Sequence, residues 1–442
     1  MSRIEGLKGT RDFYPAEMRL RRWLESRWRE VAERFAFEEY DGPVIEPLEL
    51  YVRKSGEEIV GQLYAFEDKG GRKVALRPEM TPSLARMIAA RSQGLPKPIK
   101  WYSIPRLFRY ERPQRGRLRE FFQLNLDIVG VEGIEADAEI IAAGVEVLKA
   151  CGLTESDFEV RYSDRRLLDA ALAALSIPDE AREAVYAALD KLLKADAGVV
   201  VAELEKAGVP RATAETLTRA VARRDLAGLT EELGPAGDAL AAEAERMVQL
   251  ERCLEAYGVA PFCAFDAAIV RGLAYYTGVV FEMYDRAGEL RAICGGGRFD
   301  GLVAAAGGED LPAVGFGLGD AVLLELLDSR GRVPELAAAC DAYVIPVAPG
   351  DRPAAMEAVT RIRAAGLAAD LALKDQSVGK LLKRADQSGA RVAVLIGEKE
   401  MAEGTWRVKE METGAETALP PEEAIRRLRP GGSLFEPADD SA

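Results

Sequence analysis

Residues 108–127 read FRYERPQRGRLREFFQLNLD, a stretch in which two strand-like segments flank a loop rich in arginine. Side chains in a strand alternate between its two faces, so the apolar residues of the second segment share one face. Gln123, Asn125 and Asp127 share the opposite face. The hairpin is therefore predicted to have one core face and one polar face that a sheet does not need for its stability.

The first segment of this hairpin and its loop carry the positive charge. Arg109 and Glu111 share one face of the first segment. The simpler interpretation is an amphipathic hairpin with a solvated polar face, which is the commoner case for any single hairpin. The arginine content of the loop instead favours a polyanion held over the polar face. The loop arginines are Arg112, Arg115, Arg117 and Arg119.

Length and composition restrict the class of protein. A chain of 442 residues is expected to form about two to four domains with a large core. Hydrophobic content of 48% and charged content of 30% are typical of a globular protein. The formal net charge of −14 excludes general nucleic-acid binding, so such binding would need local basic patches. No apolar run approaches the roughly 18 residues of a membrane helix.

Two residue counts exclude several chemistries. The five cysteines are widely spaced and include no CxxC pair, which indicates neither a disulfide framework nor a zinc site. The chain contains no histidine, so histidine triads, imidazole metal ligands and imidazole acid–base catalysis are all excluded. The N-terminus lacks the pattern of a signal peptide, and a cytoplasmic location is expected.

Residue patterns along the chain predict its domain organisation. Residues 1–330 are expected to form the main domain, interrupted at about 165–255 by an inserted helical module rich in Ala, Leu and Glu. Strands and helices alternate over 338–430, which predicts a separate α/β domain. Residues 431–442 are expected to be a disordered tail.

Three further segments could carry chemistry. Residues 77–81 (RPEMT) place Glu79 and Thr81 at the start of a helix, where a simple helix cap is the competing interpretation. Residues 269–278 (IVRGLAYYTG) place Arg271 beside two tyrosines, and a structural arginine with packed tyrosines is equally compatible. Residues 295–301 begin with three glycines, a weak signal that lacks the Rossmann spacing.

Taken in this order, the segments resemble the histidyl-tRNA synthetases of bacterial type, a family of class II aminoacyl-tRNA synthetases. The resemblance runs from Gly9 to about Leu428. Pro43 matches the proline of motif 1 at the dimer interface, and the opening stretch matches motif 2. The resemblance implies an α+β fold, with an antiparallel sheet flanked by helices, a helical insertion and a C-terminal α/β anticodon-binding domain. It also implies a homodimer.

The resemblance assigns a role to each matching residue. ATP, with Mg²⁺ and no protein metal site, L-histidine and tRNA(His) are the expected partners. Arg109 and Arg271 would be catalytic at the α-phosphate of ATP. Glu111, Arg117 and Arg119 would join Arg109 in binding ATP. Histidine would be bound by Glu79, Thr81, Gln123, Asp127, Tyr275 and Tyr276, while Gln114 and Arg115 would meet the tRNA acceptor end.

Some positions depart from the family pattern. Class II motif 3 normally ends in an arginine that binds the γ-phosphate, but alignment places Val322 there. Phe299 replaces a common tyrosine, and Ala274 replaces a common acid. The predicted function is histidine–tRNA ligase. The alternative is a non-ligating paralogue that senses histidine as a regulatory subunit of histidine biosynthesis, which the motif 3 departure favours and the anticodon-binding-like domain opposes.

Overall fold

The computed structural model describes residues 4–52, 61–193, 196–233, 238–270, 275–336 and 340–429. The chain divides into two compact units. The larger unit comprises Met1–Tyr14 and Arg21–Val333, and the smaller comprises Pro15–Leu20 and Pro334–Ala442. Arg271, Ala274 and the expected tail at 431–442 lie outside the described residues.

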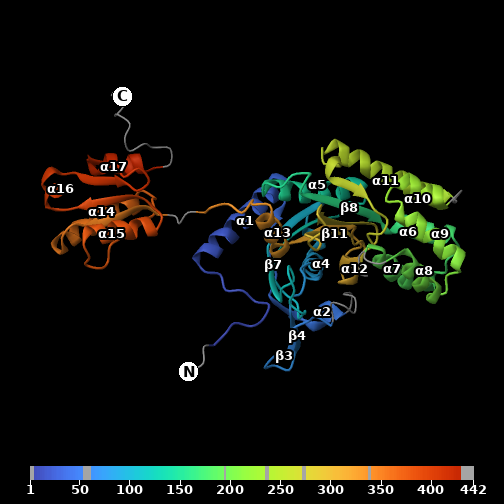
Figure 1. Ribbon diagram of the computed structural model, residues 1–442. Coiled ribbons are helices and arrows are strands. Elements are labelled where there is room, and N and C mark those ends of the chain that lie inside the picture. Colours follow the sequence, from blue (N-terminus) through green and yellow to red (C-terminus); the bar gives the residue numbers. More distant parts are fainter. Residues whose placement is uncertain are drawn as a thin grey trace. The chain divides into compact units, whose positions relative to one another are not determined.

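The larger unit is built on a mixed, mainly antiparallel sheet with the strand order β1-β5-β7-β12-β11-β10-β8-β9, and β6 pairs with β7 (Figure 1). Only β1 with β5 and β8 with β9 pair in parallel among the described strands of this sheet. The predicted α+β fold with a helix-flanked sheet is confirmed. The strands are β1 (Glu38–Glu39), β5 (Ile99–Ser103), β6 (Arg106–Phe108), β7 (Glu120–Val129), β8 (Phe158–Asp164), β9 (Cys263–Phe265), β10 (Val279–Asp285), β11 (Cys294–Arg298) and β12 (Ala313–Gly319).

The central strand β7 has one face that packs in the core and one polar face. Its side chains Phe122, Leu124, Leu126 and Ile128 are all buried, as the alternation predicted. The last three belong to the main core cluster, together with apolar side chains of α1 (Pro15–Arg34) and α5 (Ile134–Ala150). The first strand of the predicted hairpin is shorter than expected, because β6 ends at Phe108. Residues 109–119, here called the arginine loop, connect β6 to β7.

Helices fill the segment between β8 and β9. Figure 1 shows them together at the side of the sheet near β8. Asp164, the last residue of β8, accepts hydrogen bonds from the amides of Arg166 and Leu167 and so caps the first of these helices. The helices are α6 (Arg165–Ala174), η2 (Asp179–Ala181), α7 (Arg182–Leu189), η3 (Asp190–Leu193), α8 (Ala197–Lys206), α9 (Arg211–Ala222), α10 (Leu226–Leu233), α11 (Asp238–Ala256) and η4 (Ala260–Phe262).

A smaller sheet and short helices complete the larger unit. The sheet has the strand order β2-β4-β3, and the β3–β4 hairpin turns at residues 68–71. The strands are β2 (Ile45–Pro47), β3 (Ala65–Glu67) and β4 (Lys73–Leu76); the helices are α2 (Leu48–Val52), α4 (Thr81–Ala89), η1 (Ser92–Gly94), α12 (Leu302–Ala305) and α13 (Asp320–Ser329).

The smaller unit has its own sheet, with the strand order β14-β13-β15-β16-β17. The parallel pairing of β13 with β14 and β15 follows the predicted alternation of strands and helices. The final hairpin of β16 and β17 was not predicted. The elements are β13 (Cys340–Pro346), η5 (Pro349–Asp351), α14 (Arg352–Ala364), β14 (Ala369–Leu371), α15 (Val378–Gln387), β15 (Ala390–Ile396), α16 (Glu398–Glu403), β16 (Trp406–Glu410), β17 (Glu416–Leu419) and α17 (Pro421–Leu428). Within the described part of the chain, no helix has the length and apolar character needed to span a membrane.

Candidate active site

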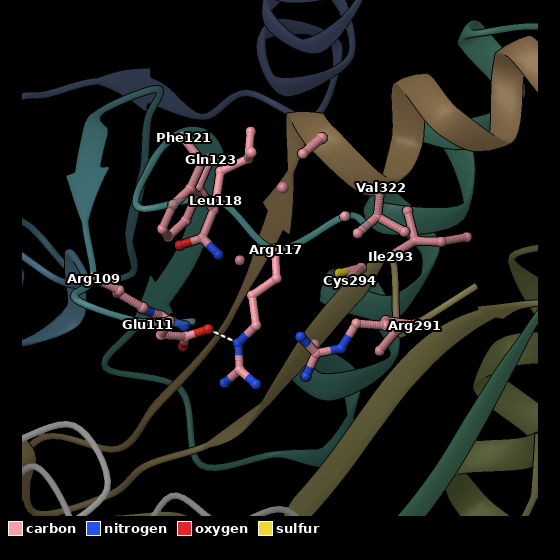
Figure 2. Close-up of a pocket in the computed structure, with 16 residues that line it drawn as sticks. Arg109, Glu111, Arg117, Leu118, Phe121, Gln123, Arg291, Ile293, Cys294 and Val322 are labelled. Carbon is pink, nitrogen blue, oxygen red and sulfur yellow. Dashed lines mark ion pairs between the residues drawn. The ribbon is translucent and has the colours of Figure 1, made fainter. Parts of the chain in front are cut away.

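A cavity of about 280 Å³ is lined by the arginine loop, by β7 and by residues at the ends of β11 and β12. Figure 2 shows Arg109 and Glu111 on one side of this cavity and Arg291 on the other, with Arg117 between them. The cavity is lined by Arg109, Glu111, Gly116, Arg117, Leu118, Phe121, Gln123, Arg291, Ala292, Ile293, Cys294, Gly295, Gly317, Gly319, Ala321 and Val322.

Three of the predicted ATP-binding residues meet in this cavity. Arg109 Nε donates a hydrogen bond to the carbonyl of Pro78 at 2.9 Å, and its guanidinium lies 5.3 Å from the centre of the Phe121 ring. Glu111 is buried and forms an ion pair with Arg117. These contacts hold two guanidinium groups beside one carboxylate at the cavity wall, an arrangement suited to a group with several negative charges.

Arg119 has a different position from the other predicted ATP-binding residues. Its Nε donates to the carbonyl of Glu111 at 2.9 Å, and its guanidinium lies 4.3 Å from the centre of the Tyr110 ring. It is not among the residues that line the cavity. In this structure Arg119 supports the arginine loop, and its contact with ATP stays a prediction.

The tip of the arginine loop is closed on itself and held by α13. The amides and carbonyls of Gln114 and Arg117 bond to each other, at 3.1 and 2.9 Å. Glu325 of α13 accepts from the Gly116 amide at 2.9 Å and pairs with Arg115 Nε at 3.0 Å. The predicted acceptor-end residues Gln114 and Arg115 are both exposed in this loop.

A second cavity, of about 50 Å³, adjoins the first. Arg109 and Gln123 line both cavities, so the two meet at these side chains. Tyr275 Oη donates to Glu79 Oε2 at 3.0 Å across the second cavity. Its lining therefore brings together most of the predicted histidine-binding residues, namely Glu79, Thr81, Gln123, Tyr275 and Tyr276.

Glu79 and Thr81 do not serve as a helix cap. Helix α4 begins at Thr81, its N-cap is Met80, and no side chain caps it. Glu79 is nevertheless buried, with its carboxylate at the cavity. Its carboxylate accepts a hydrogen bond from Tyr275 and not from the first turn of α4, so the helix-cap interpretation of this segment is wrong.

Asp127 lies on the same face of β7 as Gln123 but outside the lining of either cavity. Burial raises its pKa well above the usual value. Facing glycines give these side chains their room. A Cβ atom on Gly315 would lie 2.1 Å from Asp127 Oδ1, and one on Gly317 would lie 2.6 Å from Gln123 Cδ. The contact of Asp127 with a ligand stays a prediction.

Two arginines that were not predicted as site residues differ in position: one is buried in the core and the other lines the larger cavity. Arg298, which follows the three glycines, is fully buried and pairs with Asp137 of α5, so it joins the sheet to a helix. Arg291 was not predicted, yet it lines the larger cavity. The sequence offered one indication, because Arg291 stands just before the three-glycine segment at residues 295–301. In the described part of the chain, no group of three acidic or cysteine side chains is placed to hold a metal ion.

Comparison with known proteins identifies the family. A model described as histidyl-tRNA synthetase matches residues 9–321, and an anticodon binding domain model matches residues 341–430. The chain belongs to the histidyl-tRNA synthetase family. The matched range includes the arginine loop, the lining of the smaller cavity and all of the lining of the larger cavity except Val322.

Relatives of the same family match nearly the whole chain. The histidine–tRNA ligase of Opitutus terrae is 45% identical over 97% of this chain and 99% of its own. The chloroplastic/mitochondrial histidine–tRNA ligase of Arabidopsis thaliana is 42% identical over 92% of this chain and 83% of its own. A crystal structure of histidyl-tRNA synthetase from Nostoc sp. PCC 7120 covers 97% of this chain and 100% of its own, with a TM-score of 0.81 and 26% identity.

One structural neighbour bears on the alternative function. A Bacillus halodurans protein described as an ATP phosphoribosyltransferase regulatory subunit/histidyl-tRNA synthetase covers 90% of this chain and 100% of its own, with a TM-score of 0.73. Its sequence is only 23% identical, so this likeness shows a shared fold alone. Fold by itself does not separate a ligase from a histidine sensor.

Proposed function

We propose that this chain is a histidine–tRNA ligase, which activates histidine with ATP and transfers it to the 3′ end of tRNA(His). One observation carries the proposal: a cavity lined by an acid, an amide and tyrosines meets an arginine-lined cavity at Arg109 and Gln123. An amino acid in the first cavity and a nucleotide triphosphate in the second would have their reacting groups at this junction. Relatives over 40% identical along nearly the whole chain are histidine–tRNA ligases.

The activation step needs position and charge more than proton transfer. The carboxylate oxygen of histidine attacks the α-phosphorus, a new phosphorus–oxygen bond forms, and the bond to the bridging oxygen breaks to release pyrophosphate. Arg109 at the junction would stabilise the charge that develops on the α-phosphate. Arg271 is the proposed second cation there. The absence of histidine side chains is no obstacle to this step.

The second step transfers the activated histidine to tRNA. The terminal ribose hydroxyl attacks the carbonyl carbon of the adenylate, an ester bond forms, and AMP leaves. Gln114 and Arg115, at the exposed tip of the arginine loop, are proposed to contact the acceptor end. Residues 338–430 are proposed to bind the anticodon, and residues 1–330 to form the catalytic domain.

The smaller cavity would select histidine. Glu79 is proposed to bind the α-ammonium group together with Thr81 and Gln123, and the hydrogen bond from Tyr275 holds the Glu79 carboxylate in place. Asp127 and Tyr276 are proposed to contact the imidazole. Asp127 sits deeper along β7 than Gln123, which suits contact with the far end of a side chain.

Mg²⁺ would arrive with ATP and offset part of the charge on the leaving phosphates. Glu111 is the carboxylate among the residues that line the larger cavity, so it is the candidate protein ligand. Glu111 is already paired with Arg117, and it would have to share its oxygens between the two cations.

A homodimer in the cytoplasm is also proposed. The motif 1 proline, Pro43, immediately precedes Val44 and Ile45, whose side chains are exposed in the single chain. Exposed apolar side chains next to a short edge strand suit burial against a second copy.

The proposal is tested by histidine-dependent exchange of labelled pyrophosphate into ATP by the full chain. A ligase is expected to exchange with histidine and not with other amino acids. Arg271→Ala should lower the rate strongly. A chain that binds histidine but shows no exchange would instead be the regulatory paralogue, which the loss of the motif 3 arginine favours.

A further inference from the structure

Arg291 occupies the wall of the larger cavity that faces the arginine loop. It lies in the segment before β11, and Figure 2 shows its side chain extending into the cavity toward Arg117. The residue is exposed. Arg291 comes from a different segment than Arg109 and Arg117, which both belong to the arginine loop, so the three guanidinium groups approach the cavity from two sides.

The charges around the cavity do not balance. Arg117 is paired with Glu111 and Arg115 with Glu325, whereas no acidic side chain within the described ranges forms an ion pair with Arg291. The lining contains three arginines and the single carboxylate of Glu111. A surplus of guanidinium groups in a concave site favours a bound phosphate chain, because arginine offers two parallel donors to phosphate oxygens.

The residue at the motif 3 arginine position supplies no charge to the same cavity. Val322 is buried against the arginine loop, where a Cβ atom on Gly116 would lie 3.0 Å from Val322 Cγ2. The arginine loop therefore packs directly against α13, and the wall of the larger cavity near Val322 is apolar. Figure 2 places Val322, Ile293 and Arg291 on the same side of the cavity.

We propose that Arg291 replaces the missing motif 3 arginine and binds the β- and γ-phosphates of ATP. The inference rests on the proposed function, and it adds a phosphate-binding residue that the family pattern does not predict. Arg109 lies at the junction with the amino acid cavity and so serves the α-phosphate. Arg291 lies across the cavity, where the departing pyrophosphate would carry its charge. The same contact would bind pyrophosphate in the reverse reaction.

The test compares Arg291→Ala and Arg291→Lys with the parent in histidine-dependent pyrophosphate exchange. Arg291→Ala should raise the KM for ATP and for pyrophosphate by about 10- to 100-fold, the loss expected for one charge-assisted hydrogen bond. Arg291→Lys should retain part of the affinity, because it keeps the charge. Arg332→Ala, an exposed arginine outside both cavities, is the matched control and should leave both constants unchanged.

A second readout separates phosphate binding from a structural role. A histidyl-adenylate analogue with a sulfamoyl bridge carries no β- or γ-phosphate, so Arg291→Ala should bind it as tightly as the parent does. Parental KM values for ATP and pyrophosphate in Arg291→Ala would overturn the inference, as would an equal loss of affinity for the analogue. A parent chain without exchange would overturn the proposed function instead.

Discussion

Glu79 and Tyr275 lie 196 positions apart in the sequence, and the hydrogen bond between them positions the carboxylate that faces the smaller cavity. The pattern of residues 77–81 indicated an acid near a helix start but allowed a simple cap. The structure removes that interpretation, because α4 has no side-chain cap. A buried carboxylate held by a tyrosine is prepared for a cationic ligand.

Replacing Glu79 tests that assignment directly. Glu79→Gln keeps an oxygen that can accept from Tyr275 but removes the negative charge. We expect the KM for histidine in pyrophosphate exchange to rise by about 10- to 100-fold, since one charge-assisted hydrogen bond is lost. The KM for ATP should stay near the parental value. Glu412→Gln, an exposed acid of the smaller unit, is the control; an unchanged KM for histidine in Glu79→Gln would contradict the assignment.

Among individual residues, the sequence predicted those whose side chains follow strand alternation. It missed Arg291, which lies outside any strand or helix. Gln123, Asn125 and Asp127 were placed on one face by strand alternation, and Gln123 and Asn125 line the smaller cavity. Arg291 lies in an irregular segment, where no periodicity fixes the direction of a side chain. Its partners across the cavity come from a loop about 175 residues earlier, and only tertiary structure brings them together.

Among the elements, the arginine loop depends on α13 for its position. Glu325 contacts both the Gly116 amide and the Arg115 side chain. The helix thus holds the segment that contributes Glu111 and Arg117 to the larger cavity. This contact adds to the backbone hydrogen bonds that hold the loop beyond Phe108, where β6 ends, such as the one from the Arg109 amide to the Arg119 carbonyl.

Removing Glu325 should therefore loosen the loop. In Glu325→Ala we expect trypsin to cut after Arg115 and Arg117 faster than in the parent, because about 1 kcal/mol of stabilisation is lost. The KM for ATP should rise by about 3- to 10-fold for the same reason. Asp328→Ala, on an exposed position of the same helix, is the matched control. Equal cleavage rates in the two variants would rule out this role of Glu325.

Asp164, at the junction of β8 and α6, is a buried acid whose ionisation lowers the free energy of unfolding. Burial raises the pKa of Asp164 to about 6, against a usual 3.8, although Arg246 opposes the shift. Between these two values the unfolded chain has released its proton while the folded chain retains it. Stability is therefore lost as pH rises from about 4 through about 6, and the loss is constant above that range.

Asp164→Asn should remove this pH dependence while keeping a good N-cap for α6. We expect the free energy of unfolding of the parent, relative to the variant, to fall by up to about 3 kcal/mol between pH 4 and pH 7. Urea unfolding followed by circular dichroism at several pH values would measure it. The same pH dependence in both proteins would mean that Asp164 ionises normally in the folded chain.

The three glycines that begin residues 295–301 belong to a strand. The sequence marked them as a weak signal for chemistry, whereas the structure places them inside β11. Glycine has low strand propensity, but its partner strands impose the conformation. Gly296 pairs with Phe281 and Phe316, and a Cβ atom there would lie 2.6 Å from both side chains. Close packing of neighbouring strands explains the run better than a ligand does.

On the scale of the whole molecule, an acidic protein has a local basic site. The net charge of −14 excluded general nucleic-acid binding, yet the larger cavity is lined by three arginines and one acid. The resemblance to a known family implied the α+β fold class, and the alternation of strands and helices predicted the α/β character of residues 338–430. The joining of the two cavities was not predicted, because it depends on β7, β11 and β12 lying side by side. The family match over residues 9–321 agrees with the segments that the motifs marked.

Charging by the full chain is the most direct test that this protein joins histidine to tRNA(His). Purified protein would be given ATP, labelled histidine and a tRNA(His) transcript, with a transcript for another amino acid as the control. We expect labelled histidine in ester linkage at the 3′ end of tRNA(His) alone. Histidine binding without any transfer to tRNA would contradict this expectation and favour the sensor.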